Sequence, residues 1–222
     1  MSAPRALLLD AGGVLYHHTS DYPRVVFERA ASHLRTLGAS ATPESVSRVL
    51  DNWRLDPHVQ QDIFYAASLI LSRHGLIPTP ARAEALAETM ADAVVSSMIL
   101  APGAGELLHW AKRVGLLVAV VSNNWCRVCL LRALTRDNIV HLVDALVSSD
   151  SVGFAKPHPA IYNAALGLLG VEPKYALFID DYGPNVEAAK SLGIKAILHD
   201  GRPLYEYIPV VSRLLLEVDE PG

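Results

Sequence analysis

Arg5-Ala6-Leu7-Leu8-Leu9-Asp10-Ala11-Gly12-Gly13-Val14-Leu15 lies near the start of the 222-residue chain and decides its fold. The residues before Asp10 form a continuous apolar run, which is typical of a strand buried on both faces of a parallel sheet. The two glycines after Asp10 allow the backbone to turn sharply and to approach a ligand closely. Ligands of open α/β sheets bind at the carboxyl ends of the strands, so Asp10 is a candidate functional residue. The same residues also fit an ordinary strand followed by a turn that begins at an aspartate.

The composition predicts one packed globular protein, because hydrophobic residues make up 51% of the chain and charged residues 19%. The net charge is −4 and no block of Lys or Arg occurs, so neither nucleic acid nor an anionic membrane is an expected partner. The apolar run near the start is too short for a signal peptide, and no stretch approaches the roughly 18 apolar residues of a membrane span. Cys126 and Cys129 are too few for a disulfide framework or a four-thiolate zinc site. We therefore expect a soluble, cytoplasmic protein.

Residues 17–99 are predicted to form an insert that contains only helices. Apolar residues recur there at helical spacing in four segments, and a proline near the first turn marks the start of three of them. Those starts are predicted at Thr42-Pro43, Asp56-Pro57 and Thr79-Pro80. Short connections between the helices favour an antiparallel four-helix bundle. The remaining chain, residues 1–16 and 100–222, is predicted to form the core domain.

From residue 100 onward the pattern changes to alternating strands and helices. Buried strands are predicted at 116–121, 145–147, 175–179 and 195–198, with helices between them and a last helix over 204–218. Repeated strand–helix units imply a parallel sheet with right-handed crossovers. The predicted fold is therefore a Rossmann-like α/β core with helices on both faces of its sheet.

Polar residues suited to one phosphate site follow three of the predicted strands. Ser122-Asn123 offers a hydroxyl and backbone amides that can hold anionic oxygens, and Asp180-Asp181 adds two carboxylates to Asp10. Crowded carboxylates repel one another unless a cation lies between them. Hard oxygen ligands of this kind suit Mg²⁺. Lys156 precedes a predicted helix and supplies a second cation that can neutralise both phosphate and nucleophile.

In order and spacing, these segments resemble the four motifs of the haloacid dehalogenase-like hydrolase superfamily. Asp10 is similar to the nucleophile of the first motif, and Ser122 matches the second. Lys156, in Lys-Pro-His-Pro-Ala-Ile-Tyr, matches the third, and Asp180-Asp181 with Asn185 matches the fourth. The helical insert resembles the cap of that family, so the likeness extends over the whole chain. It implies a sheet of order 3-2-1-4-5 with Asp10 on the central strand.

The resemblance also implies an activity, namely Mg²⁺-dependent hydrolysis of a small phosphorylated metabolite. Asp10 would attack phosphorus and form an aspartyl-phosphate, which water then hydrolyses. Mg²⁺ would be held by the Asp10 and Asp181 carboxylates and the backbone carbonyl of Gly12, with Asp180 close by or acting through water. Two further residues, Ser122 and Asn123 through its amide, would bind the phosphoryl oxygens together with Lys156.

Gly12 departs from the family pattern, because most phosphatases of the family carry there a second aspartate that protonates the leaving group. A glycine keeps the backbone carbonyl but has no acid, and losing a positioned general acid costs roughly 10²–10⁴-fold in rate. Val14 likewise stands where a threonine is common. We therefore expect slow turnover. Two alternatives stay open: a catalytically silent relative that binds a phospho-ligand or partner, and a 2-haloacid dehalogenase, whose halide leaves without protonation.

Two pairs of neighbouring residues allow a functional or an ordinary interpretation. His17 and His18 follow the first motif, and one of them could replace the missing acid, although a solvated hairpin tip is the simpler interpretation. Cys126 and Cys129 have the spacing of a redox motif, although ordinary packing on a helix is more common for such a pair. The sequence does not determine the oligomeric state.

The cap is expected to close over the core and exclude water from the phosphorylated intermediate. Substrate choice should then depend on cap residues that face the site. Arg24, Trp53 and Arg54 are candidates, since Arg pairs with anions and Trp can stack, although Trp53 also fits a packing role.

Overall fold

The computed structural model describes residues 5–51 and 62–215. Its centre is a five-stranded parallel sheet of order β5-β4-β1-β6-β7. Counted along the chain among these five strands, that order is 3-2-1-4-5, so the predicted α/β topology is confirmed. The strands are β1 (Ala6–Leu9), β4 (Leu117–Ser122), β5 (Ala145–Ser148), β6 (Ala176–Asp180) and β7 (Lys195–Leu198).

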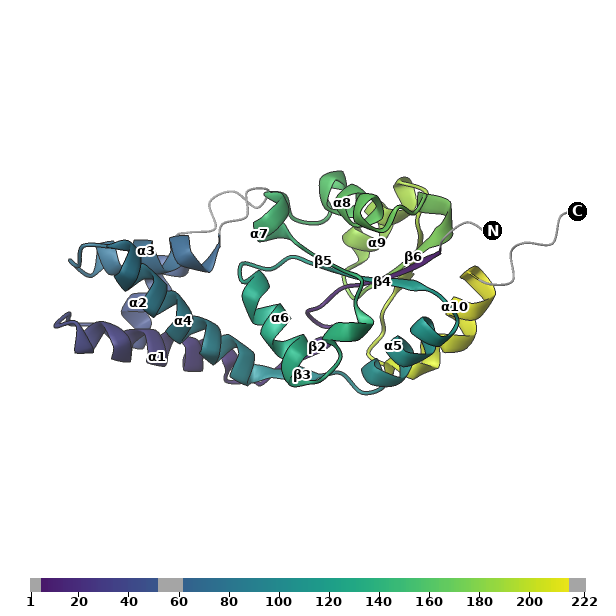
Figure 1. Cartoon of the computed structure of the whole chain (residues 1–222). Coiled ribbons are helices and arrows are strands. Elements are labelled where there is room, and N and C mark those ends of the chain that lie inside the picture. The colour runs from purple at the N-terminus through teal and green to yellow at the C-terminus, as the bar shows by residue number, and fades with distance from the viewer. Residues whose placement is uncertain (1–4, 52–61, 216–222) are drawn as a thin grey trace, which may run out of the picture.

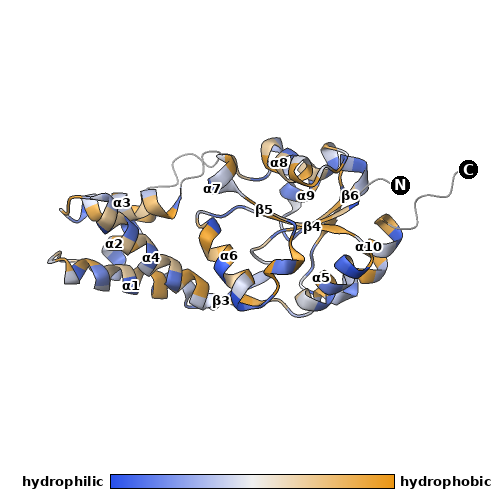
Figure 2. Cartoon of the chain, viewed as in Figure 1, coloured by the Kyte–Doolittle hydropathy of each residue, from blue (hydrophilic) through white to orange (hydrophobic). Residues whose placement is uncertain are grey.

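The central strand β1 is buried on both faces, which explains its unbroken apolar sequence. Leu8 pairs with Ala119 of β4 on one side and Phe178 of β6 on the other. Leu7 and Leu9 belong to one hydrophobic core, and Leu8 lies in a second core on the opposite face of the sheet. Figure 2 shows the apolar strands running between the helical layers. Asp10, at the end of β1, is thereby fixed at the middle of one sheet edge.

Helices cover both faces of the sheet (Figure 1). The first core is closed by α5 (Ala104–Arg113), α6 (Arg127–Arg136) and α10 (Ile208–Leu215). The second core is closed by α8 (Pro159–Leu169) and α9 (Gly183–Ser191). Short elements complete the core: α7 (Ser149–Val152) and the 3₁₀ turns η1 (Val140–Leu142), η2 (Pro173–Tyr175) and η3 (Leu204–Tyr207).

The predicted helix over 204–218 is wrong in its first turn. The structure has the 3₁₀ turn η3 there, and α10 begins only at Ile208. Pro203, with a ψ of 137°, precedes the turn and holds the chain extended immediately before it. Residues 216–218 lie outside the described part of the chain.

Four helices lie to one side of the core (Figure 1). Among them, α1 and α4 pack along each other, α3 packs on α4, and α2 contacts both α1 and α3. None of the described helices is both long and apolar enough to cross a membrane. The boundaries 17 and 99 of this insert stay a prediction. The helices are α1 (Tyr22–Thr36), α2 (Pro43–Asp51), α3 (Ile63–Arg73) and α4 (Pro80–Ser97).

Helix starts in the insert follow local capping chemistry. Pro43 and Pro80 are the first residues of α2 and α4, as predicted. The predicted start at Asp56-Pro57 lies outside the described residues, as do Trp53 and Arg54. The described helix α3 begins at Ile63, because the side chain of Asp62 accepts a hydrogen bond of 2.8 Å from the backbone N–H of Tyr65.

A two-stranded antiparallel ribbon connects the four helices to the core. It consists of β2 (Tyr16–His18) and β3 (Met98–Leu100), with His17 paired to Ile99. The interpretation of His17 and His18 as a hairpin tip is therefore wrong, since both lie within a paired strand. The ribbon fixes both ends of the insert close to Asp10, because β2 begins six residues after it.

Candidate active site

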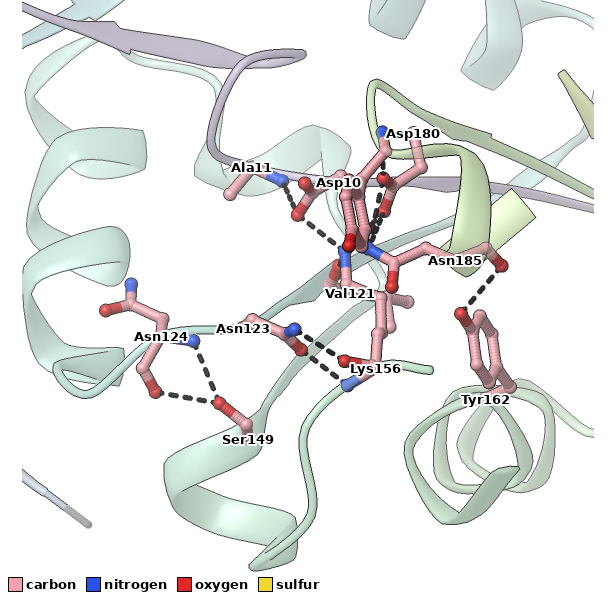
Figure 3. A network of polar contacts seen from close by, with 11 residues as sticks. Asp10, Ala11, Val121, Asn123, Asn124, Ser149, Lys156, Tyr162, Asp180 and Asn185 are labelled. Atoms are coloured by element: carbon pink, nitrogen blue, oxygen red, sulfur yellow. Dashed lines mark hydrogen bonds and ion pairs between the residues drawn. The ribbon is translucent and has the colours of Figure 1, made fainter. Parts of the chain in front are cut away.

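The carboxyl ends of β1, β4 and β6 meet at one edge of the sheet and bring the predicted polar residues together. Asp10 follows β1, Ser122 ends β4 and Asp180 ends β6. Lys156 reaches the same point from the loop before α8, as Figure 3 shows. All four residues are buried or nearly so. The predicted convergence of distant segments is thus present in the fold.

Lys156 is the hub of this cluster. Its Nζ lies 2.7 Å from Oδ1 of Asp10 and 2.7 Å from Oδ2 of Asp180. It also donates a hydrogen bond of 2.8 Å to the backbone carbonyl of Val121. The Lys156 side chain is 0% exposed, and a buried cation needs such partners to offset its lost hydration. These three contacts occupy all three N–H bonds of the ammonium group.

Asn123 positions Lys156 through two hydrogen bonds to its backbone. The side-chain Oδ1 of Asn123 accepts from the Lys156 N–H at 2.6 Å, and its Nδ2 donates to the Lys156 carbonyl at 2.9 Å. The end of β4 is therefore tied to the loop that carries the lysine (Figure 3). The sequence indicated Asn123 only through its amide, and this positioning role of its side chain was missed.

Asp180 and Asp181 differ sharply in their surroundings. Asp180 is fully buried, and its oxygens accept hydrogen bonds from the Tyr182 N–H at 2.8 Å and from Nδ2 of Asn185 at 3.1 Å, besides the ion pair with Lys156. Asp181 is exposed. Asp180 therefore orients its neighbours, while Asp181 is the carboxylate of the pair that can approach a ligand.

Gly13 makes room for Asp181. Its φ is +79°, a conformation that favours glycine. A Cβ atom at this position would lie 2.6 Å from Cγ of Asp181, so any side chain would displace the carboxylate. The absence of a side chain at Gly13, in the turn after β1, thus leaves the space that the Asp181 carboxylate after β6 occupies.

The acidic groups form a set that fits a divalent cation. One carboxylate oxygen from each of Asp10, Asp180 and Asp181 lies within 4.8 Å of the others. Oδ1 of Asn185 is buried and has no hydrogen-bond partner among the described residues, so it can accept a bond from a bound water. Asp10 and Asp181, with the Gly12 carbonyl nearby in sequence, offer the hard oxygen ligands that Mg²⁺ prefers, and Asp180 lies beside them with its oxygens already hydrogen-bonded.

The charge of Asp10 depends on its neighbours. Burial raises its pKa from 3.8 to about 6, Lys156 opposes that rise, and the Asp180 carboxylate adds to it. A raised pKa means that the charged form of Asp10 is less favoured in the folded protein than in the unfolded chain. A divalent cation beside Asp10 would favour the charged form and so would bind in competition with a proton.

A cavity of about 390 Å³ opens directly above Asp10. Ser122, Asn123 and Lys156 line it from the core, so all the predicted phosphate-binding residues face one space. His18 lines it from the ribbon, and this residue accepts or donates a hydrogen bond of 2.8 Å between its Nδ1 and Oγ of Ser97. Burial lowers the pKa of His18, which favours the neutral ring. Of the two histidines, His18 is the one in the described lining of the cavity, and the hypothesis that a histidine replaces the missing acid stays a prediction.

Cys126 and Cys129 form a disulfide at the start of α6, and the interpretation as ordinary packing is wrong. Cys126 caps the helix, and its sulfur accepts a hydrogen bond of 3.2 Å from the backbone N–H of Cys129. The Cα atoms are 5.3 Å apart, within the usual range for a disulfide. The bridge follows Trp125 in the loop that leaves β4 beside the cavity.

Comparison with known families decides the identity of this site. The family described as haloacid dehalogenase-like hydrolase matches residues 4–193, which include Asp10, Ser122, Lys156 and the Asp180-Asp181 pair. The chain belongs to this family. The resemblance inferred from the four motifs is therefore confirmed.

Several curated relatives of this hydrolase carry phosphatase names. Phosphatase MT3486 from Mycobacterium tuberculosis is 39% identical over 99 residues, which cover 45% of this chain and 46% of the relative. Validoxylamine A 7'-phosphate phosphatase from Streptomyces hygroscopicus is 33% identical over 145 residues, covering 62% and 67%. The match to mouse bifunctional epoxide hydrolase 2 covers only 16% of that protein. The alignments thus span about half the length of the first of these relatives and much less of the last.

Solved structures share the fold of this hydrolase. A predicted hydrolase of the family from Porphyromonas gingivalis superposes with a TM-score of 0.65 at 20% identity, covering 97% of this chain and 99% of the other. An enzyme of the family from Bacteroides thetaiotaomicron, in complex with magnesium and inorganic phosphate, gives 0.62 at 19% identity, covering 93% and 99%. At about 20% identity, the similarity to these two structures shows that the fold is shared and nothing more.

Gly13→Ala tests whether the glycine in the turn after β1 is needed to keep the Asp181 carboxylate in its position in the acidic cluster. We expect Mg²⁺ affinity to fall by about 10-fold to 100-fold, the effect typical of disturbed outer-shell contacts, because the new Cβ displaces Asp181. Isothermal titration of Mg²⁺ measures the change. Gly12→Ala is the matched control, since a Cβ there meets nothing within 4 Å. Equal losses in the two variants would contradict the role of Gly13.

Proposed function

We propose that this hydrolase is a Mg²⁺-dependent phosphatase of a small phosphorylated metabolite and that it acts through an aspartyl-phosphate on Asp10. The observation that carries the proposal is the placement of Asp10 at the floor of a cavity, paired to the buried Lys156 and next to Asp180 and Asp181. The phosphatase names of MT3486 and of validoxylamine A 7'-phosphate phosphatase support the same activity.

Asp10 would act as the nucleophile. Its Oδ1 is engaged by Lys156 and by the N–H of Ala11, at 2.7 and 2.6 Å, and Oδ2 takes part in neither contact. An oxygen of Asp10 would form a bond to phosphorus while the bond from phosphorus to the ester oxygen breaks, and the departing oxygen takes up a proton. Water then attacks phosphorus, releases phosphate and restores the carboxylate.

The other polar residues of the cavity would bind and neutralise the phosphoryl group. The Ser122 hydroxyl and the backbone N–H of Asn123 are suited to donate hydrogen bonds to the phosphoryl oxygens, and Lys156 adds positive charge beside them. Mg²⁺ held by Asp10, Asp181 and the Gly12 carbonyl would supply further charge neutralisation at the same oxygens. Asp180, with its oxygens bonded to Lys156, Asn185 and Tyr182, would keep the lysine in place.

The proposal is tested by a screen of sugar phosphates, nucleotides, acyl phosphates and 2-haloacids, each with and without Mg²⁺. We expect Mg²⁺-dependent release of phosphate that Asp10→Asn abolishes. Metal-independent release of halide would favour the dehalogenase alternative. Absence of both activities would favour the alternative of a catalytically silent relative. That alternative stays open because Gly12 has no carboxyl group to act as the general acid.

Gly12→Asp is expected to accelerate the reaction, because it restores a proton donor where the family has one. A Cβ at Gly12 meets nothing within 4 Å and the residue does not adopt a positive φ, so the side chain can be accommodated. For an alkyl phosphate, whose leaving group needs a proton, kcat should rise at least about tenfold. An aryl phosphate with a good leaving group should respond much less.

Gly12→Asn is the matched control for this prediction, since asparagine has the same size and cannot donate an acidic proton. Steady-state kinetics on both esters distinguishes the two variants. An equal gain with asparagine, or no gain with aspartate on the alkyl ester, would show that proton donation does not limit this hydrolase.

A further inference from the structure

A second cavity of about 290 Å³ adjoins the one above Asp10. The two share Tyr22 and Trp125 in their linings, so they meet where the first turn of α1 faces the loop after β4. Among the described residues, the second cavity is also lined by Val26, Phe27 and Leu50, which are apolar. A ligand whose phosphate lies above Asp10 can therefore extend between Tyr22 and Trp125 into apolar surroundings.

Among the described residues, the charges in the two linings suit one anionic group and disfavour a second. Lys156 is the cation among the described lining residues, and its three N–H bonds are already used by Asp10, Asp180 and Val121. In the second cavity the charged residue within the described lining is Asp51, a carboxylate. A second phosphate placed there would find like charge and no cation from these residues.

Along its apolar wall, away from Asp51, the second cavity offers no hydrogen-bond partner to a hydroxyl group among the described residues. A sugar hydroxyl that moves from water to an apolar wall loses hydrogen bonds that Val26, Phe27 and Leu50 cannot replace. An aliphatic or aromatic group gains from the same burial, and a ring can pack against Trp125 or against Tyr22, whose own ring stacks on His18 at 3.9 Å. The walls therefore favour a ligand with one phosphate and one apolar body.

We propose that the second cavity is the leaving-group subsite and that the substrate is a phosphate monoester of an aliphatic or aromatic alcohol, not a sugar bisphosphate. This inference rests on the proposed phosphatase function, because it uses Asp10 as the anchor of the phosphate. It assigns substrate selection to the end of α2, the first turns of α1 and Trp125.

Binding of phosphonates tests the subsite without turnover. The full chain in Mg²⁺ is titrated by calorimetry with methyl-, butyl- and hexylphosphonate and with 3,4-dihydroxybutylphosphonate. Each buried methylene should improve Kd by about fourfold, so burial of only two of the five additional methylenes should make hexylphosphonate bind at least about tenfold more tightly than methylphosphonate. The dihydroxy compound should bind more weakly than butylphosphonate. A flat series, or tighter binding of the dihydroxy compound, would overturn the inference.

Two substitutions in the second cavity test whether the gain in phosphonate affinity with chain length arises there. Leu50→Gln should remove most of the gain from methyl- to hexylphosphonate while leaving the Kd of methylphosphonate unchanged. Asp51→Lys, at an exposed helix end, should improve binding of hexane-1,6-bisphosphonate relative to hexylphosphonate. Phe64→Ser is the control, since this aromatic residue is 44% exposed on α3 and is absent from the described linings of both cavities. Unchanged series in both cavity variants would refute the assignment.

The outcome separates this inference from the phosphatase proposal. Hydrolysis of sugar phosphates that depends on Asp10, together with a flat phosphonate series, would overturn the subsite and leave the phosphatase intact. Tight binding of hexylphosphonate that Leu50→Gln weakens, without hydrolysis of any ester, would support the subsite and overturn the phosphatase in favour of a silent phospho-ligand binder.

Discussion

Lys156→Met is expected to lower the free energy of unfolding by about 3–5 kcal/mol, the cost of breaking a buried ion pair by removing one partner. The Asp10 and Asp180 carboxylates, both 2.7 Å from Nζ in the native protein, would face each other without a cation between them. Methionine has a similar length and no charge, so packing changes little. Activity should fall by at least about 10²–10³-fold, since the charge beside the phosphate is lost as well.

The destabilisation should depend on pH, and its direction follows from the pKa of Asp10. Burial already raises that pKa from 3.8 to about 6, and Lys156 is the group that limits the rise. Without the lysine the folded-state pKa of Asp10 rises further. The free energy of unfolding of the variant therefore falls further below that of the wild type as the pH increases above about 6. Urea unfolding at about pH 5 and about pH 8, in chelator, should show the larger loss at the higher pH.

Lys190→Met is the control, because Lys190 is half exposed and pairs with Glu187 at the surface. Its substitution should change stability by less than about 0.5 kcal/mol. The double variant Lys156→Met with Asp10→Asn should recover part of the loss, since one of the two uncompensated carboxylates is gone. A loss below about 1 kcal/mol for Lys156→Met at the higher pH would contradict the central role of the buried pairs.

The sequence sufficed to predict the sheet and the convergence of the polar groups, for a physical reason. Each buried strand is a short apolar run whose end is marked by the first polar residue, as with Leu9 and Asp10. Parallel strands put those ends on one edge, so residues as distant as Asp10 and Asp180 can be placed together without knowing any side-chain geometry.

The different roles of the individual site residues could be assigned only from the structure. Asp180 and Asp181 are adjacent and chemically identical in the sequence, and burial alone distinguishes them, with the first at 0% exposure. The positioning roles of Asn123 and of the Asn185 side chain depend on which backbone or carboxylate lies opposite, and no pattern in the sequence encodes that pairing.

The ribbon was missed, and for the two cysteines ordinary packing was favoured over the redox-motif interpretation, because both features depend on geometry that local sequence patterns do not carry. The strands β2 and β3 have three residues each and pair across the whole insert, too short for an alternating pattern to be visible. The Cys126–Cys129 bridge requires Cys126 to lie outside the helix with an extended φ, whereas the spacing alone also fits two cysteines on one helical face.

Asp10→Asn is expected to abolish activity while leaving the fold intact or more stable. Loss of the nucleophile should reduce kcat/KM on the order of 10⁴-fold or more, because the other groups of the site can act only on a phosphoryl group that Asp10 attacks. Asparagine keeps the shape of the side chain and can still accept from Lys156 and Ala11, the present partners of Oδ1. Steady-state kinetics on a monoester in saturating Mg²⁺ measures the loss.

The stability of the same variant gives an independent measure of the charge at this position. Because the folded-state pKa of Asp10 is raised to about 6, ionising this group costs the native protein stability as pH rises from about 4 to 6. In chelator, the asparagine variant should therefore equal the wild type at low pH and exceed it by about 1–3 kcal/mol above pH 6.

Mg²⁺ should reverse that order. A ligand that binds only the folded state stabilises it in proportion to its saturation, and the wild type keeps the carboxylate that the proposed Mg²⁺ site requires. The melting temperature of the wild type should thus rise with Mg²⁺ while that of Asp10→Asn changes much less. An asparagine variant that is less stable than the wild type in chelator, or that responds equally to Mg²⁺, would show that the Asp10 carboxylate is a structural partner of Lys156 and holds no cation.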